Sequence, residues 1–351
     1  MKRIQKVQKA LKSYKIDALV VQNPVDLFYL TGVELSLGTL VISEKSARLF
    51  VDGRYIEKCK ANCAVDVGNL LQQDIDAYCK KHKAIGFDAD STSYQAYTVL
   101  SKANSHLVPL SKPIEKIRAV KEASEIKAME RAGKLCMKGF DFLCTQLKTG
   151  VTEKALARAL EIFWLSNGGE KLAFDPIIAF GKNSSMPHYR AQDTKLCAGD
   201  IVLIDIGVMV DGYASDITRI VFYGKPKAKL LEIYDIVKKA KDKAFEACCP
   251  GIEASDLYKV AAKVIEKAGY KEAFLHGLGH GIGLNVHEYP ILRATVTDAP
   301  LQASMAVTLE PGIYLPGIGG VRLEDTVLVT KTGCRAITTA PEEKIIMSSS
   351  V

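Results

Sequence analysis

The sequence lacks any apolar run long enough to cross a membrane. A membrane-spanning helix needs about 20 consecutive apolar residues, and no stretch of the 351-residue sequence approaches that length. The basic start, MKRIQKVQKALKSYK, also lacks the apolar segment of a secretory signal peptide, and its periodicity predicts an amphipathic helix. We therefore expect no membrane partner and a cytoplasmic protein.

Paired cysteine motifs are missing as well. The nine cysteines are odd in number and none has CxxC spacing, which indicates free thiols in a reducing compartment. Cys59 and Cys63 could be metal ligands. Their spacing of four also places them on one face of a helix, and this is the simpler interpretation.

The sequence has no nucleic-acid-binding signature, although its formal net charge is +7. The densest group of lysines, between Lys225 and Lys243, alternates with apolar residues at helical spacing. These lysines have no interleaved aromatic residues and belong to no known nucleic-acid module. We interpret the segment as the solvated face of a helix and expect no nucleic acid partner.

Length and pattern predict an α/β protein of two domains, residues 1–112 and 113–351. The first part alternates strands with helices and carries no cluster of acidic residues, so we assign it no chemistry. Lys112-Pro113 is the expected linker, because the residue before a proline is disfavoured in a helix. The predicted strands of this part are 17–22, 38–43, 47–51 and 84–87, and its predicted helices are 3–14, 55–61, 70–81 and 94–102.

The second part contains two pairs of predicted helices, each accompanied by a strand hairpin that carries acidic residues. This arrangement suggests an internal duplication. The predicted helices are 124–148, 152–168, 228–249 and 255–268, and the later predicted strands are 306–310 and 320–329.

The stretch from Ile201 to Tyr223 places two acidic residues inside apolar strands. Asp211-Gly212 predicts a two-residue hairpin turn, which makes Gly207 face Asp216. The side-chain period of two then puts Asp205 on the same face as Asp216. Two buried carboxylates about 5–8 Å apart are unfavourable unless a cation lies between them. One aspartate could instead face solvent at a strand end, but a metal site is the better interpretation.

Two glutamates near the C-terminus extend this acidic set. Glu310 ends an apolar strand before Pro311, and Glu324 lies inside the predicted strand 320–329. Arg322 is two residues from Glu324 and shares its face, whereas Asp325 points the opposite way. Arg322 alone could neutralise a buried Glu324, so these two glutamates indicate a metal site only together with Asp205 and Asp216.

Four of the six histidines fall between His188 and His287, which suggests a shared role. His276 and His280 lie among four glycines, where the backbone can approach a ligand closely. His280 and the four carboxylates form an oxygen-rich set that suits Mn²⁺, with Co²⁺ or Zn²⁺ as further possibilities. Five ligands exceed the number that one ion with open positions needs, so we predict two bridged ions.

These residues resemble a known ligand set. The order Asp205, Asp216, His280, Glu310, Glu324 is similar to that of the dinuclear metallopeptidases with the pita-bread (creatinase/aminopeptidase) fold, which include methionine aminopeptidases, aminopeptidase P and prolidase. Motifs similar to those of the proline-specific branch extend over nearly the whole chain. They are Asn23-Pro24, Tyr29–Gly32, Val51–Tyr55, Ile117–Lys121, Met186–Tyr189, His276–Gly283, Val286–Glu288 and Leu309–Gly312.

The resemblance implies a role for each site residue. Asp205 would chelate one ion, His280 and Glu310 the other, and Asp216 and Glu324 would bridge the two. Glu310 would also act as general base. His188 and His287 would hydrogen-bond the scissile carbonyl and the leaving nitrogen. On the substrate side, the resemblance implies that His276 lines the pocket and that Arg322 supports the carboxylate ligands.

The expected activity is hydrolysis of Xaa-Pro peptide bonds in peptides by a homodimeric aminopeptidase P-like enzyme, with a dipeptide-restricted prolidase as the alternative. Some prolidases place a carboxylate-binding arginine directly after the proline that follows the His-Glu pair. Here Ile291 follows Pro290, and the arginine comes at Arg293. Arg293 is therefore the candidate substrate-binding arginine. A metal-free creatinase-like enzyme or a non-catalytic binding protein would not need the five ligands.

Overall fold

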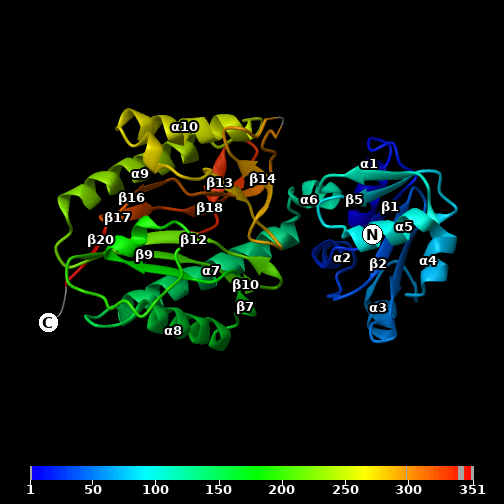
Figure 1. Cartoon of the computed structure of the whole chain (residues 1–351), viewed down its shortest axis with the longest axis horizontal. Helices are drawn as coiled ribbons and strands as arrows, with labels where there is room; N and C mark the ends of the chain where they lie inside the picture. The colour runs from blue at the N-terminus through cyan, green and yellow to red at the C-terminus, as the bar shows by residue number, and fades with distance from the viewer. Residues whose placement is uncertain (1, 298, 339–343, 349–351) are drawn as a thin grey trace. The chain divides into compact units, whose positions relative to one another are not determined.

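The structure is a computed structural model that describes residues 2–297, 299–338 and 344–348 (Figure 1). The chain divides into two compact units after Arg118. Within the described residues, no helix has the length and apolar character needed to span a membrane.

The first unit is built on one six-stranded sheet with the order β4-β3-β2-β1-β5-β6. β1 and β2 are buried at every residue, as expected for strands that are covered on both faces. The strands are β1 (Ala18–Val21), β2 (Thr39–Ser43), β3 (Ala47–Val51), β4 (Asp66–Asn69), β5 (Ile85–Asp88) and β6 (Leu107–Leu110), and the helices are α1 (Lys2–Ala10), α2 (Pro24–Thr31), α3 (Ile56–Asn62), α4 (Gln72–Cys79), α5 (Tyr94–Ala103) and α6 (Pro113–Arg118).

Two prolines of this unit begin helices that the sequence pattern did not predict. Pro24 opens α2, where Asn23 Oδ1 accepts a hydrogen bond from the Val25 N–H at 2.9 Å. Pro113, placed in the expected linker, opens α6. A proline fits the first helical turn because the N–H it lacks would have no partner there.

In the second unit, strands lie between two pairs of helices, with α7 and α8 on one side and α9 and α10 on the other (Figure 1). The larger sheets have the orders β20-β12-β9-β8 and β14-β13-β15-β18-β19, and the smaller ones β11-β10-β7 and β16-β17. The helices are α7 (Ala123–Gln146), α8 (Glu153–Ser166), α9 (Ala228–Ala247) and α10 (Ala254–Lys267), with short 3-10 turns η1 (Gly181–Ser185) and η2 (Lys271–Ala273).

The strands of this unit are short apart from β9 and β12, which have seven residues each. They are β7 (Lys171–Leu172), β8 (Ile177–Phe180), β9 (Asp200–Ile206), β10 (Val208–Val210), β11 (Tyr213–Ala214), β12 (Ile217–Tyr223), β13 (Gly279–Gly281), β14 (Glu288–Leu292), β15 (Ala306–Leu309), β16 (Gly312–Leu315), β17 (Gly319–Arg322), β18 (Asp325–Val329), β19 (Cys334–Ala336) and β20 (Ile345–Met347).

β9 and β12 are apolar on both faces because they separate two hydrophobic cores. Val202 and Ile204 pack with α7 and α8, whereas Ile201 and Leu203 pack in the core of α9 and α10. Side chains of a strand alternate between its faces, so the part of a strand that serves two cores has consecutive apolar residues, as at 201–204 in β9 and 220–223 in β12.

The predicted hairpin register is confirmed. Val210 pairs with Tyr213 and Ile206 with Ile217, so one register runs from the turn through β12 and sets Gly207 opposite Asp216. Asp211 and Gly212 have φ of 51° and 74°, the left-handed values that a two-residue turn requires.

The prediction of one strand over 320–329 is wrong. The chain forms β17 and β18 with a break at Leu323-Glu324, although Gly312↔Arg322 and Leu309↔Asp325 keep a single register across it. Pro311 lies opposite the break and has no N–H for the ladder, so pairing stops there. The hairpin thereby passes from the five-stranded sheet into the sheet of β16 and β17.

The suggested duplication is visible in the backbone. Gly150 N–H donates to the Leu196 carbonyl at 2.9 Å, and Gly251 N–H donates to the Leu301 carbonyl at 2.8 Å. Both glycines have left-handed φ, 84° and 89°, and each lies three residues before the first residue of α8 or α10. In both halves a helix pair is followed by a long hairpin that passes from one sheet to another.

Candidate metal centre

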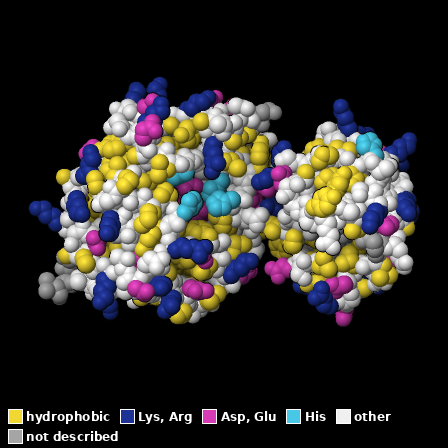
Figure 2. Space-filling model, viewed as in Figure 1, with side chains coloured by type: hydrophobic (Ala, Val, Ile, Leu, Met, Phe, Trp, Pro, Cys, Tyr) yellow, Lys and Arg dark blue, Asp and Glu magenta, His cyan; other side chains and the backbone are white. Residues whose placement is uncertain are grey.

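All ten residues predicted for the site line one cavity of about 570 Å³ in the second unit. The space-filling view shows histidine side chains gathered around acidic ones at a hollow on this unit (Figure 2). The ten are Asp205, Asp216, His188, His276, His280, His287, Arg293, Glu310, Arg322 and Glu324.

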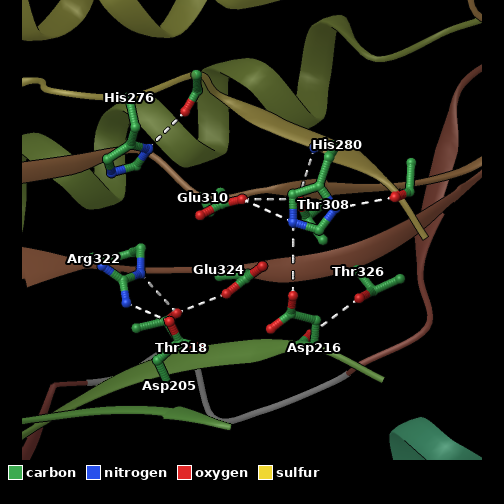
Figure 3. A network of polar contacts seen from close by, with 12 residues as sticks. Asp205, Asp216, Thr218, His276, His280, Thr308, Glu310, Arg322, Glu324 and Thr326 are labelled. Atoms are coloured by element: carbon green, nitrogen blue, oxygen red, sulfur yellow. Dashed lines mark hydrogen bonds and ion pairs between the residues drawn. The ribbon is translucent and has the colours of Figure 1, made fainter. Parts of the chain in front are cut away.

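The acidic residues lie where the two hairpins change sheets. Asp216 occupies the gap between β11 and β12, Glu310 the gap between β15 and β16, and Glu324 the gap between β17 and β18. Asp205 lies on β9 directly opposite Thr218 of β12, and Thr218 also forms a bridge to Glu324. The four carboxylates thus come from two hairpins that meet at Thr218 (Figure 3).

Three carboxylate oxygens in this cluster need a partner that the protein does not supply. Among the described residues, Asp205 Oδ1, Asp216 Oδ1 and Glu324 Oε1 are buried without a hydrogen bond. Burial, reinforced by neighbouring carboxylates, raises the pKa of Asp216 and of Glu324 well above the ordinary range. Ionised carboxylates in such surroundings require a cation, so these oxygens fit a divalent metal ion.

His280 places a ring nitrogen at the same point. Its Nδ1 donates to the Gly281 carbonyl at 3.0 Å, so in the neutral ring, the form that binds a metal ion, Nε2 carries the lone pair. Without a metal ion, burial would lower the pKa of His280, but the hydrogen bond and charge of Glu310 outweigh burial and raise it, so the ring is positively charged there. Nε2 lies 3.3 Å from Glu310 Oε1 and 3.7 Å from Asp216 Oδ2. One ligand atom from each of Asp216, His280 and Glu324 lies within 4.8 Å of the others. An imidazole nitrogen among carboxylate oxygens is an arrangement suited to a metal ion.

The pKa of Glu310 is shifted in the opposite direction from that of Glu324. Burial alone would raise its pKa, but the hydrogen bond and charge of His280 outweigh burial and lower the pKa to about 2. Thr308 donates to Glu310 Oε1 at 3.1 Å and also accepts the His280 backbone N–H at 3.0 Å. Glu310 is therefore held ionised and fixed next to His280.

Threonine hydroxyls that sequence reasoning missed orient the acidic residues. Thr218 donates to Glu324 Oε2 at 2.6 Å, and Thr326 donates to the Asp216 carbonyl at 3.0 Å. Both threonines, like Thr308, are at most 1% exposed. The sequence did contain a signal for two of these threonines. Thr218 lies two residues after Asp216, and Thr308 lies two residues before Glu310, so each threonine shares a strand face with its acidic neighbour.

Arg322 is fully engaged with protein groups. It contacts Asp205 Oδ2, its Nε donates to Thr218 Oγ1 at 3.1 Å, and another nitrogen donates to the Tyr314 hydroxyl at 2.6 Å. Tyr314 lies 2.8 Å from His276 Nε2, and His276 Nδ1 donates to the Gly277 carbonyl at 2.7 Å. Arg322, Tyr314 and His276 form a chain along the cavity wall, and both ring nitrogens of His276 are used within it.

The other two histidines and Arg293 lie toward the open side of the cavity. The His287 ring packs against the His280 ring at a centroid distance of 4.3 Å. Burial, and then the charge of His280, lower the pKa of His287, so it is neutral near pH 7. His188 follows η1 and is exposed. Ile291 and Arg293 are both exposed and both line the cavity, with buried Leu292 between them.

The glycines around His280 have a packing role that we did not predict. A Cβ at Gly279 would lie 2.0 Å from the Thr308 carbonyl oxygen, and one at Gly281 would lie 2.2 Å from that of Tyr289. These positions need glycine because neighbouring strands approach them; the close approach of this backbone to a ligand stays a prediction.

Comparisons with known proteins agree with this geometry. The metallopeptidase family M24 matches residues 127–331, and the creatinase/prolidase N-terminal domain matches residues 3–120. An Xaa-Pro dipeptidase of Pyrococcus furiosus is 34% identical over 97% of this chain and 99% of its own length.

Solved structures show the same architecture over the whole chain. An Xaa-Pro dipeptidase from Bacillus anthracis has a TM-score of 0.95 at 34% identity and covers 99% of both chains. An X-Pro aminopeptidase from Thermotoga maritima has a TM-score of 0.86 at 32% identity and covers 97% of this chain and 100% of its own. The pita-bread fold with its additional N-terminal α/β domain is thereby confirmed. The chain belongs to metallopeptidase family M24, in the branch that carries the creatinase/prolidase N-terminal domain, and is a metallo-exopeptidase.

Proposed function

We propose that this enzyme is an Xaa-Pro dipeptidase that uses two divalent metal ions, Mn²⁺ first among the candidates. The observation that carries the metal-dependent part of the proposal is the set of three carboxylate oxygens without a hydrogen bond, on residues that line the cavity together with His280. Asp205, Asp216, His280, Glu310 and Glu324 would hold the ions. An oxygen-rich ligand set with one imidazole supports Mn²⁺ over softer metals.

The bound ions would supply Lewis-acid chemistry, polarising the scissile carbonyl and lowering the pKa of a water molecule. The protein residues would do the rest. Glu310 is ionised, so its carboxylate would accept the proton of the attacking water and deliver it to the leaving nitrogen. Neutral His287 would donate a hydrogen bond to the developing oxyanion, and His188 would hydrogen-bond the departing proline nitrogen.

The dipeptidase alternative is better supported than the aminopeptidase P-like activity that we predicted first. That prediction depended on Ile291 standing where some prolidases have an arginine. Pyrococcus furiosus and Bacillus anthracis relatives that match the whole chain are Xaa-Pro dipeptidases. Arg293 lines the cavity, and its side chain packs against Gly277, where a Cβ would lie 2.8 Å from Arg293 Cγ. We therefore propose that Arg293 binds the C-terminal carboxylate of the dipeptide.

Substrate length tests this proposal. We expect kcat/KM for an Xaa-Pro dipeptide to exceed that for the matching Xaa-Pro-Xaa tripeptide by more than about tenfold, which corresponds to roughly 1.4 kcal/mol. Arg293→Ala should remove this preference, whereas Arg190→Ala, at the other exposed arginine of the cavity, should preserve it. Equal or faster cleavage of the tripeptide would instead establish the aminopeptidase activity.

A further inference from the structure

A buried carboxylate outside the metal centre ties together both ends of one active-site loop. Glu153, the first residue of α8, is 0% exposed. Its Oε1 accepts the Phe180 N–H at 2.8 Å and the Asn183 side-chain amide at 3.0 Å. Its Oε2 accepts the Tyr189 hydroxyl at 2.8 Å and the Gln192 N–H at 3.0 Å.

The four donors bracket the segment that carries His188. Phe180 and Asn183 lie before His188, Tyr189 follows it directly, and Gln192 closes the loop. His188 itself is exposed and lines the cavity. All four donors are neutral, and the carboxylate lies at the N-terminus of α8, where a negative charge is favoured. Hydrogen bonds to a buried charged acceptor are stronger than those between neutral groups, so this attachment is firm.

The duplicated half shows that the fold does not need a carboxylate at this position. Glu153 N–H donates to the Thr194 carbonyl at 3.2 Å, and Ala254 N–H donates to the Ala299 carbonyl at 3.3 Å. Glu153 and Ala254 are thus counterparts, each the first residue of the second helix in its pair. Ala254 is also 0% exposed. In that half the first helical residue has no acceptor, and the preceding Glu253 accepts one backbone N–H, that of Ala299 at 3.0 Å. Among the described residues of the two helix starts, four donors converge on one carboxylate only in the half with the His188 loop.

We propose that Glu153 is a positioning residue, which fixes loop 181–192 and through it holds His188 over the substrate cavity. This inference rests on the proposed role of His188 in substrate hydrolysis. Glu153 itself touches neither the cavity nor the predicted metal ligands, so its effect on catalysis must pass through the loop. Displacing a catalytic group by about 1 Å can cost on the order of 100-fold in rate.

Glu153→Gln is the discriminating variant because it keeps the size of the side chain and changes its hydrogen bonding. The amide has one acceptor oxygen and one donor NH₂ group. Whichever way it turns, the NH₂ group faces a backbone N–H, either that of Phe180 or that of Gln192. One end of the loop therefore loses its attachment.

The first measurement is hydrogen exchange of the metal-loaded enzyme. We expect amides in 180–192 to exchange about tenfold faster or more in Glu153→Gln, the scale expected for losing a buried hydrogen bond. The matched control is Glu253→Gln, at the start of α10, where Glu253 Oε2 accepts the Ala299 N–H at 3.0 Å. This control should leave exchange in 180–192 unchanged. Unchanged exchange in Glu153→Gln would overturn the proposal.

The second measurement is a double-mutant cycle with His188→Ala. We expect Glu153→Gln to lower kcat about 10–100-fold in the wild-type background, with metal content unchanged. In the His188→Ala background it should lower kcat less than about threefold, because the group that it positions is already gone. Equal effects in both backgrounds would show a general structural role and would contradict the proposal.

Two controls keep these outcomes distinct. If Glu153→Gln does not fold, Asn183→Ala removes one donor outside the cavity lining and should give a smaller change of the same kind in exchange and kcat. If His188→Ala retains wild-type kcat, the proposed role of His188 in the function is wrong. Hydrogen exchange then still decides whether Glu153 fixes the loop.

Discussion

Thr218 is the residue at which the two halves of the metal centre meet. Its backbone pairs with Asp205 and bridges to Glu324. Its hydroxyl accepts a hydrogen bond from Arg322 Nε at 3.1 Å and donates one to Glu324 Oε2 at 2.6 Å. A hydroxyl has one proton, so acceptance from Arg322 directs that proton to Glu324. Glu324 Oε1 is then left to face a cation.

Thr218→Val keeps the shape of the side chain and removes this hydrogen bond. We expect a 10- to 100-fold loss of metal affinity, the usual cost of losing a group that orients a ligand. Titration calorimetry of the metal-free protein with Mn²⁺ measures it. Thr145→Val is the matched control, because Thr145 is exposed on α7 and bonds only groups of its own helix, the Phe142 carbonyl at 2.7 Å and the Gln146 side-chain amide at 3.0 Å. Equal affinities for the two variants would refute this role of Thr218.

His287→Ala should impair catalysis and spare the metal ions. His287 contacts the His280 ring at its side and lines the cavity. We expect kcat to fall about 10²–10³-fold, as for the loss of one transition-state hydrogen-bond donor. Metal analysis should still give two ions per chain. Loss of one ion would make His287 a ligand and would require a new assignment.

The ten site residues could be predicted from residue type, spacing and family resemblance, and the structure brings all ten to one cavity. The hydroxyls of Thr218, Thr308 and Thr326 could not be assigned in the same way. Their partners are fixed by which strands pair and by which rotamer each carboxylate adopts. The hydrogen bond at His276 Nε2 likewise depends on Tyr314, which lies 38 residues away in sequence.

At the level of elements, each acidic hairpin keeps one register while it passes between two sheets. The ladders stop at Asp216 in the first hairpin and at Glu310 and Glu324 in the second. A break in the ladder bends the chain and re-aims a side chain, which is how three carboxylates converge. The first hairpin could be predicted because its Asp-Gly turn is local. The break at Leu323-Glu324 could not, because its cause, Pro311, lies on the partner strand.

Gly279→Ala should destabilise the fold through a backbone clash. The new Cβ would lie 2.0 Å from the Thr308 carbonyl oxygen, and backbone cannot move aside cheaply. We expect the free energy of unfolding to fall by about 3 kcal/mol, the upper range for overpacking. Urea denaturation measures it against Gly333→Ala, where nothing lies within 4 Å of the new Cβ. A midpoint equal to that of the control would contradict the packing described for β13.

At the level of the whole molecule, the second unit consists of two similar halves. The carboxylates buried between these halves are not all paired with a positively charged group. The left-handed glycines Gly150 and Gly251 and the helix starts at Glu153 and Ala254 match between the halves. Sequence alone suggested this duplication only from the order of helices and hairpins. The matching hydrogen bonds involve Leu196 and Leu301, which lie about 50 residues from their partners, so local patterns could not show them.

Stability of the metal-free enzyme should fall as pH rises. Burial raises the pKa of Asp216 and Glu324, so above about pH 4 the folded state binds more protons than the unfolded state and loses stability with increasing pH. Metal ions compete with these protons and remove the penalty. We expect Mn²⁺ to raise Tm more at pH 8 than at pH 5, by calorimetry. An equal rise at both pH values would contradict this charge arrangement.

The most direct test of the account is hydrolysis measured against metal occupancy. The enzyme is stripped of metal with a strong chelator, the absence of metal is verified by elemental analysis, and Mn²⁺ is returned in steps while cleavage of an Xaa-Pro dipeptide is followed. We predict no hydrolysis by the metal-free protein and full activity at two ions per chain, because the orphaned oxygens of Asp205, Asp216 and Glu324 surround the reaction centre. Full activity in the verified metal-free protein would contradict it.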